Sequence, residues 1–224
     1  RPSLSQKNDL KPWQKAQWCI PKVNYEFVAR MEDILDLYAE AHDPYYPVVC
    51  FDERPMQLVA HTLAPIPTRP GHPAKYDYHY KRMGTCNLFI SFAPQLAWRH
   101  VQISDRRTIA DFAKQMRWLV DHAFPKALKI RIVLDNLNTH KVASLYKTFT
   151  PDEARRIARR LEFHFTPVHA SWLNMAETEW AVLTQQCLKQ RIASQTQLLR
   201  QIAMWETERN VNKDTIKWLF TCEK

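Results

Sequence analysis

Three acidic residues occupy positions where a carboxylate could do chemistry. Asp52 directly follows the apolar run at 48–51, and Asp135 follows the apolar run at 130–134. Both runs are typical of short buried strands. In open α/β sheets the reactive crevice lies outside the carboxyl ends of the strands, so both aspartates are placed to reach it. The alternative for each aspartate is that it only begins a turn, where Asp bonds its own backbone.

Glu177 is the third such acid, on a predicted helix that begins near Ser171. At 3.6 residues per turn, Glu177 shares a mostly apolar face with Leu173 and Trp180, so we expect its carboxylate to point inward, whereas Glu179 lies elsewhere on the helix. A buried carboxylate needs a partner, and no basic residue lies within one helical turn. One interpretation is a cation shared with other carboxylates, and the other is pairing with a distant arginine.

Three carboxylates from two strand ends and one helix are the ligand set of a two-metal phosphoryl-transfer site. Mg²⁺ and Mn²⁺ prefer oxygen ligands, and two such ions about 4 Å apart can stabilise the attacking and the leaving oxygen together. The chain has only two glycines, Gly71 and Gly84. This scarcity argues against a dinucleotide fingerprint, a Walker phosphate loop and a G-x-S-x-G nucleophile turn. Phosphate chemistry would therefore depend on side chains and metals.

The composition favours a polyanionic partner. The chain has 224 residues, with 32 Lys and Arg against 23 Asp and Glu and a formal charge of +9. Such a charge fits nucleic acid binding, although many basic proteins bind none. No apolar run approaches the ~18 residues of a membrane span. The first residue is Arg1 rather than Met, so we expect a processed product or a piece that lacks an N-terminal module.

The cysteines indicate a reducing compartment. They are scattered, odd in number and never in a C-x-x-C pair, which argues against a disulfide framework or a zinc ribbon. The five are Cys19, Cys50, Cys86, Cys187 and Cys222.

The order of apolar periodicities predicts one α/β domain behind an N-terminal arm at 1–24. Strands are expected at 47–52, 85–93, 97–104, 130–134 and 161–165. Helices are expected at 25–42, at 108–122, in two short stretches of which the second opens at 151–153, and from 171 to 210 with a break near 192–194. The proline-rich segment 62–84 is expected to be an irregular insertion. Antiparallel neighbours should come first and crossover connections later.

Three segments around the acids resemble the DDE transposases of the mariner superfamily, and above all their bacterial branch typed by insertion sequence six-thirty. The segments are VVCFDE at 48–53, RIVLDNLNTH at 131–140 and TPVHASWLNMAETEW at 166–180. In that family an aspartate, often followed by glutamate, ends the first strand, D-N-x-x-x-H ends the fourth, and a segment with L-N-x-x-E-x-x-W carries the last acid. Asp52, Asp135 and Glu177 fall on these acids. The flanking matches are Asn136, His140, Pro167, Ser171, Leu173, Asn174 and Trp180.

The resemblance runs from about Trp18 to the end of the chain and implies both a fold and an activity. The fold would be a ribonuclease-H-like (retroviral-integrase-type) α/β domain, a mixed sheet flanked by helices, over 25–224. The activity would be metal-dependent hydrolysis of a phosphodiester at transposon ends, followed by 3′-hydroxyl strand transfer into target DNA at a TA dinucleotide. Asp52, Asp135 and Glu177 would be the catalytic acids and would hold Mg²⁺ or Mn²⁺, as two ions.

The resemblance also implies partners and a location. Double-stranded DNA, as terminal inverted repeats and as target, would be the substrate, and a homodimer would form in the transposition complex. We expect a bacterial cytoplasmic protein that is associated with the nucleoid when bound to DNA, with no membrane contact. A helix-turn-helix region that reads the transposon ends is implied as well, and residues 1–24 could not form one.

Several neighbours of the acids are candidates for auxiliary roles, each with a structural alternative. Possible aids to the acids are Glu53, Asn136, His140 and Asn174. Possible DNA contacts are the run Arg155, Arg156, Arg159 and Arg160, which could equally be a solvated helix face, and Trp172, which could stack on a base or pack its loop. His164 and His169 lack the spacing of a zinc site, so a core or surface role is favoured.

Three other functions compete with a transposase. The first is a catalytically silent DNA-binding descendant of the same fold, against which the intact set of acids argues. The second is another ribonuclease-H-like nuclease, such as a junction resolvase or ribonuclease H, against which L-N-x-x-E-x-x-W argues. The third is a basic scaffold without a nucleic-acid role, which only the composition supports.

Overall fold

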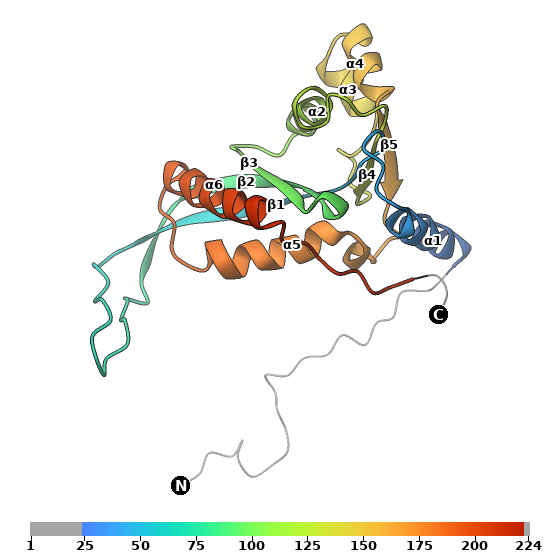
Figure 1. Cartoon of the computed structure of the whole chain (residues 1–224). Helices are drawn as coiled ribbons and strands as arrows, with labels where there is room; N and C mark the ends of the chain where they lie inside the picture. The colour runs from blue at the N-terminus through green and yellow to red at the C-terminus, as the bar shows by residue number, and fades with distance from the viewer. Residues whose placement is uncertain (1–23, 222–224) are drawn as a thin grey trace.

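A mixed five-stranded sheet runs through residues 24–221, the part of the chain that this computed structural model describes (Figure 1). Its strands are β1 (Val48–His61), β2 (Tyr80–Ala93), β3 (Trp98–Ser104), β4 (Ile130–Leu134) and β5 (Leu161–Phe165). They lie in the order β3-β2-β1-β4-β5. β1, β2 and β3 pair antiparallel, whereas β4 pairs parallel with β1 and with β5. The expected order of antiparallel neighbours followed by crossovers is therefore confirmed.

Helices cover both faces of this sheet. They are α1 (Tyr25–Ala39), α2 (Ile109–Trp118), α3 (Ala143–Thr148), α4 (Pro151–Ala158), α5 (Met175–Leu183) and α6 (Gln195–Asn212). One hydrophobic core lies between the sheet and α1, α5 and α6, and a second lies between the sheet and α2, α3 and α4 (Figure 1). Wide helical turns follow α2 at Leu119–Ala123 and α5 at Thr184–Leu188.

The pleat of β1 sorts its side chains between the two cores, because successive side chains of a strand point to opposite faces. Phe51 belongs to the core under α2, and Cys50 belongs to the core under α5. By the same alternation Asp52 and Arg54 point to the face that α5 covers, and Glu53 points to the face that α2 covers. One strand thus serves both sides of the site.

The prediction that the first strand ends at Asp52 is wrong, because β1 continues to His61. The parallel partner β4 pairs only with residues 48–50 of β1, whereas the antiparallel partner β2 pairs with β1 along most of residues 50–61. Asp52 therefore lies just beyond the point where parallel pairing stops, inside a strand that β2 prolongs.

The irregular insertion is shorter than predicted. It spans 62–79 rather than 62–84, because β2 already begins at Tyr80, and it projects beyond the helices in Figure 1. The first six residues of β2 are exposed on both faces. They therefore show no alternation of apolar and polar residues, and only their pairing with β1 defines them as strand. Gly84 lies among them with φ +103°, a conformation that favours glycine.

The C-terminal helical region also differs from its prediction. A single turn at Ser171–Leu173 precedes α5, which begins at Met175, and the non-helical break before α6 covers 189–194. The strands at 130–134 and 161–165 and the helix that Thr108 caps are confirmed.

Residues 1–23 of the expected arm at 1–24, Cys19 and Cys222 lie outside the described residues, and the other three cysteines are free and buried. Within 24–221, no helix is long and apolar enough to cross a membrane.

Thr108→Ala tests the cap of α2. The hydroxyl of Thr108 accepts from the Asp111 backbone N–H at 3.3 Å, and the Asp111 carboxylate accepts from the Thr108 backbone N–H at 2.9 Å. Loss of this capping box should lower the free energy of unfolding by about 1 kcal/mol in urea titrations. Thr207→Ala is the control, since Thr207 lies inside α6 and its hydroxyl donates to the Ala203 carbonyl of the same helix, so its loss should stay within about 0.5 kcal/mol. Equal losses would contradict the cap.

Candidate active site

The fold brings Asp52, Asp135 and Glu177 to one edge of the sheet. Asp52 lies on β1 and Asp135 follows β4, its parallel neighbour, while Glu177 lies in the first turn of α5. Burial, together with the negative charges of Glu177 and Asp135, raises the pKa of Asp52 to about 7 against the opposing hydrogen bond from the Glu53 backbone N–H. The three carboxylates therefore lie within electrostatic reach of one another.

The three acids differ in their access to solvent. Asp52 is 9% exposed, and its Oδ1 accepts from the backbone N–H of Glu53 at 2.8 Å. The side chains of Asp135 and Glu177 are 35% and 30% exposed. The site is thus a buried aspartate flanked by two carboxylates that a bound molecule can reach from outside.

Glu177 is paired with an arginine rather than left unpartnered. Its carboxylate forms an ion pair with Arg54, whose guanidinium also lies 5.5 Å from the ring centroid of Trp180. Of the two interpretations open from the sequence, pairing with a distant arginine is therefore the arrangement in the structure. Arg54 stands two residues after Asp52 on β1, so the pleat directs both side chains toward α5.

Glu179 is a buried acid that the sequence interpretation missed. Its side chain is fully buried, whereas Glu177, the acid expected to point inward, lies at the margin of α5. The prediction places Leu173 and Glu177 on one face of a single helix, but Leu173 belongs to a separate turn that ends before α5 begins. A signal for its burial was available, because Glu179 immediately precedes Trp180 in a predominantly apolar helix.

His140 connects two of the acidic side chains in the second core. The ring is fully buried, with Nδ1 at 2.7 Å from Asp135 Oδ1 and Nε2 at 3.1 Å from Glu53 Oε2. Burial by itself lowers the pKa of His140, but the hydrogen bonds and charges of Asp135 and Glu53 outweigh it and raise the pKa to about 9. The ring is therefore an imidazolium at neutral pH, and its two N–H groups donate to Asp135 and Glu53. Glu53 and His140 thus orient Asp135.

Asn174 joins the helix of the last acid to the strand of the first. Its Nδ2 donates to the Phe51 carbonyl at 2.8 Å, and its Oδ1 accepts from the Ala176 backbone N–H at 3.1 Å as the N-cap of α5. Phe51 immediately precedes Asp52, and Ala176 immediately precedes Glu177. This one side chain therefore links the backbone segments of two of the acids.

Asn136 performs a similar role beside Asp135. Its Nδ2 donates to the Thr166 carbonyl at 2.5 Å, which joins the end of β4 to the end of β5. Its Oδ1 accepts from Arg30 of α1. Glu53, His140 and Asn174 thus contact an acid or the backbone next to one, whereas Asn136 ties the end of β4 to β5 and to α1.

The arginine run of α4 lies away from the acids. The backbone carbonyl of Arg160 accepts from Ile130 N–H at the start of β4, whereas Asp135 follows the other end of that strand. Arg156 pairs with Asp121 and Glu153, both at 2.7 Å. The Arg160 guanidinium donates to three backbone carbonyls of the segment before β4, those of Phe124, Pro125 and Ala127.

The other members of that run are free to contact phosphate. Arg155 and Arg159 are exposed, and their side chains have no ion pair with any residue of 24–221. Trp172 is 47% exposed and packs 5.4 Å from the ring of Phe220. His164 lies 2.8 Å from Asp33 of α1, which is the structural role expected of it.

The donor chemistry of the site fits a hard divalent cation. Carboxylate oxygens are the ligands that Mg²⁺ and Mn²⁺ prefer. As the side chains stand, no three His, Cys, Asp or Glu residues in 24–221 are close enough to enclose an ion. Glu177 is paired with Arg54 and Asp135 with His140. Closure round an ion therefore requires Glu177 to leave Arg54.

Comparison with known proteins identifies a family and a fold. Residues 47–199, about two thirds of the chain, match the family described as DDE superfamily endonuclease. Among solved structures, the chain is similar to the Mos1 mariner paired end complex with Mn, at 15% identity and TM-score 0.57, covering 93% of this chain and 64% of that one. The chain is also similar to the Mos1 strand transfer complex, at 14% identity and TM-score 0.58, covering 89% of this chain and 61% of that one.

A third Mos1 structure, the paired end complex with Mg, gives 13% identity, TM-score 0.52, and coverage of 95% and 69%. This likeness confirms the ribonuclease-H-like mixed sheet flanked by helices. The chain spans about 64% of the length of the first Mos1 chain it matches. Curated proteins gave no match.

Substitutions of Asn174 test the link between β1 and α5. Asn174→Ala removes both the cap and the bond to the Phe51 carbonyl, and should lower the free energy of unfolding by about 2 kcal/mol in urea titrations. Asn174→Ser keeps a capping hydroxyl but is too short to reach Phe51, so it should lose about 1 kcal/mol. If the serine variant loses as much as the alanine variant, the cap contributes nothing to stability.

Proposed function

The chain belongs to the DDE superfamily endonucleases, and we propose that it is the catalytic part of a DNA transposase that cleaves DNA at transposon ends and transfers the strands to target DNA. One observation carries this proposal. Two neighbouring parallel strands and an N-capped helix bring Asp52, Asp135 and Glu177 to one sheet edge, as an acidic phosphoryl-transfer site requires. The fold likeness to Mos1 complexes, whose titles name paired ends and strand transfer, supports it.

Within that family the chain is a member of the mariner superfamily, in the bacterial branch typed by insertion sequence six-thirty. This assignment rests on the three motifs around the acids. The substrate is double-stranded DNA, as terminal inverted repeats and as a target cut at TA, and the working form is a homodimer in the bacterial cytoplasm. The catalytic domain is 25–224, with 1–24 as an arm that leads to it.

Each residue of the site has a role in this chemistry. Two divalent ions, when bound, would polarise the scissile phosphate and activate the attacking oxygen. Asp52 and Asp135 would share these ions, and Glu177 would complete the second ligand set after it leaves Arg54. His140 keeps Asp135 oriented, and Glu53 keeps His140 charged. Arg54, once released, can face a phosphate of the DNA. No covalent protein intermediate forms.

A catalytically silent DNA-binding relative is the second candidate. The ion pair between Arg54 and Glu177 favours it, because a permanent pair would deny the site its third ligand. The two functions differ in one measurable property, since only the transposase requires the acids to bind divalent metal.

Asp135→Asn tests the catalytic role directly. The amide cannot supply the negative charge that a divalent ion needs, so Mg²⁺-dependent cleavage of duplex DNA carrying the ends of the parent element should fall below detection. Retention of that DNA in gel-shift assays should be nearly unchanged. Asp152→Asn, which makes the same change at an exposed position of α4, should cleave normally. Cleavage that survives Asp135→Asn would refute the mechanism, and a wild-type chain that binds DNA without cleaving it would favour the silent relative.

Arg54→Met tests whether this arginine competes with metal. A partly exposed ion pair is worth up to about 1 kcal/mol, so its removal should strengthen Mn²⁺ binding by about threefold to fivefold. The loss of the free Mn²⁺ signal in electron paramagnetic resonance titrations measures that affinity. Arg155→Met on α4 removes the same charge far from the acids and should change the affinity little. Unchanged or weaker binding by the Arg54 variant would show that the pair does not restrain Glu177.

A further inference from the structure

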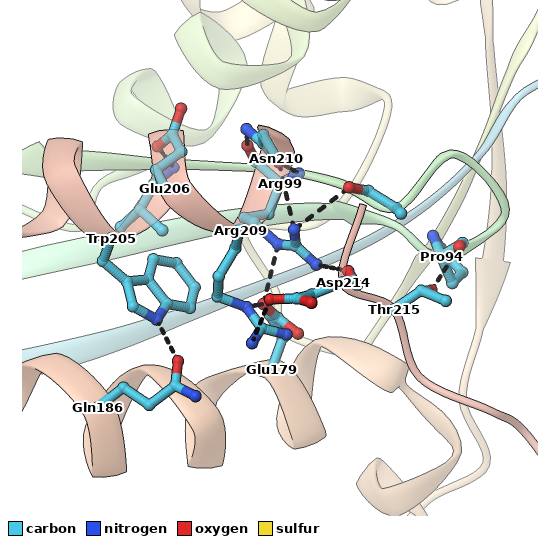
Figure 2. Close-up of polar contacts among 12 residues, drawn as sticks. Pro94, Arg99, Glu179, Gln186, Trp205, Glu206, Arg209, Asn210, Asp214 and Thr215 are labelled. Carbon is cyan, nitrogen blue, oxygen red and sulfur yellow. Dashed lines mark hydrogen bonds and ion pairs between the residues drawn. The ribbon is translucent and has the colours of Figure 1, made fainter. Parts of the chain in front are cut away.

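A buried ionic cluster joins α5 to the edge strand β3 and to the C-terminal helix α6 (Figure 2). The side chains of Arg99 on β3 and Glu179 on α5 have no exposed surface, and Arg99 Nε lies 2.9 Å from Glu179 Oε1. Arg209 of α6 reaches the same oxygen with its Nε at 3.1 Å. One carboxylate oxygen is thus held by two guanidinium groups from two different elements.

Apart from a hydrogen bond of Nη1 to the Ala97 carbonyl at 3.2 Å, the other donors of Arg99 bind the C-terminal part of the chain (Figure 2). Its Nη1 lies 3.3 Å from Asn210 Oδ1, and its Nη2 donates to the Asp214 carbonyl. Asn210 also bonds the backbone of Arg99 at both its N–H and its carbonyl, each at 2.9 Å. The segment after α6 therefore turns back onto the same cluster that holds α5.

This cluster restrains the rotation of α5. A buried charge is costly unless it is paired in good geometry, so a rotation that separates Glu179 from its arginines is strongly opposed. Glu177 stands two residues earlier, about 200° round the helix, and faces Arg54 of β1. Because the two carboxylates belong to one rigid helix, any roll of α5 that moves Glu179 also redirects Glu177.

We propose that Glu179 is a positioning residue, which sets the rotation of α5 through Arg99 and Arg209 and thereby aims Glu177 at the site of Asp52 and Asp135. The proposal rests on the proposed function, because it takes Glu177 as a metal ligand. Asn174 fixes the start of α5 against β1, and Glu179 fixes its rotation against β3. With both contacts in place, the backbone of Glu177 is held beside the site before any ligand binds, and only its side chain has to turn from Arg54 to the ion.

A merely structural role must be separated from this one, and Glu206 offers the matched control. Glu206 also joins α6 to β3, with Oε1 at 3.0 Å from His100 Nδ1 and Oε2 at 3.0 Å from the Val101 backbone nitrogen. None of its described contacts is with α5. Substitution of Glu206 therefore weakens the contact between α6 and β3 and leaves the rotation of α5 unchanged.

The experiment compares Glu179→Gln, Glu179→Asp and Glu206→Gln in the 224-residue chain. Circular dichroism melts first define a temperature at which each variant is folded, and electron paramagnetic resonance then measures Mn²⁺ affinity there. Both Glu179 variants should bind Mn²⁺ about tenfold more weakly than wild type, and Glu206→Gln should stay within about twofold. Glu179→Asp keeps the negative charge that pairs with Arg99 but places it on a shorter side chain. If the glutamine variant does not fold, the aspartate variant alone tests the positioning role.

Two results would overturn the positioning role. One is a folded Glu179→Asp variant whose Mn²⁺ affinity stays within about twofold of wild type, and the other is a loss in Glu206→Gln as large as that in the Glu179 variants. A wild-type chain that binds no Mn²⁺ at all would contradict the proposed metal site instead. The two failures are therefore distinguishable in a single set of titrations.

Discussion

The short parallel pairing between β1 and β4 is the contact on which the candidate site depends. It extends over three residue pairs and ends where Cys50 lies opposite Val133. Just beyond that point β2 is the one strand of 24–221 that still pairs with β1, so Asp52 and Asp135 are left at the same edge without a strand between them. The pleat then divides the next residues of β1 between the two faces of the sheet. This arrangement places Asp52 beside Asp135 and directs Glu53 and Arg54 to opposite faces of the sheet.

Charge compensation differs between the centre of the site and its supports. Behind Asp135, the imidazolium of His140 is held between two carboxylates, and behind α5 the carboxylate of Glu179 is held between two guanidinium groups. These buried groups are paired, as their burial requires. At the acidic centre, the guanidinium of Arg54 pairs with Glu177. The three acids at the centre outnumber the two cations that pair with them, Arg54 and His140, and such an excess of acidic groups is the electrostatic form of a site that receives a cation.

Several elements of the structure were predictable because their signals are local. The strand at 130–134 is predominantly apolar, the strand at 161–165 alternates apolar and polar residues, and Thr108 with Asp111 is a recognisable helix start. The beginning of β2 was not predictable, because its first six residues are exposed on both faces and are defined by pairing with β1. The outer part of β1, in which Leu58 is buried, is prolonged by the same pairing. The phase of α5 was misjudged because a short turn interrupts what the periodicity presents as a single helix.

The sequence by itself determined the order and spacing of the three acids, the apolar strands that carry two of them, and the motif with Asn174 before the last acid. Those features depend on residues close together in the chain. Tertiary structure alone decided which charges meet: Arg54 with Glu177, and Arg99 with Glu179, are 123 and 80 residues apart. Their pairing depends on the register of β1 and β3 and on the rotation of α5. Those are properties of packing between elements, and no local pattern encodes them.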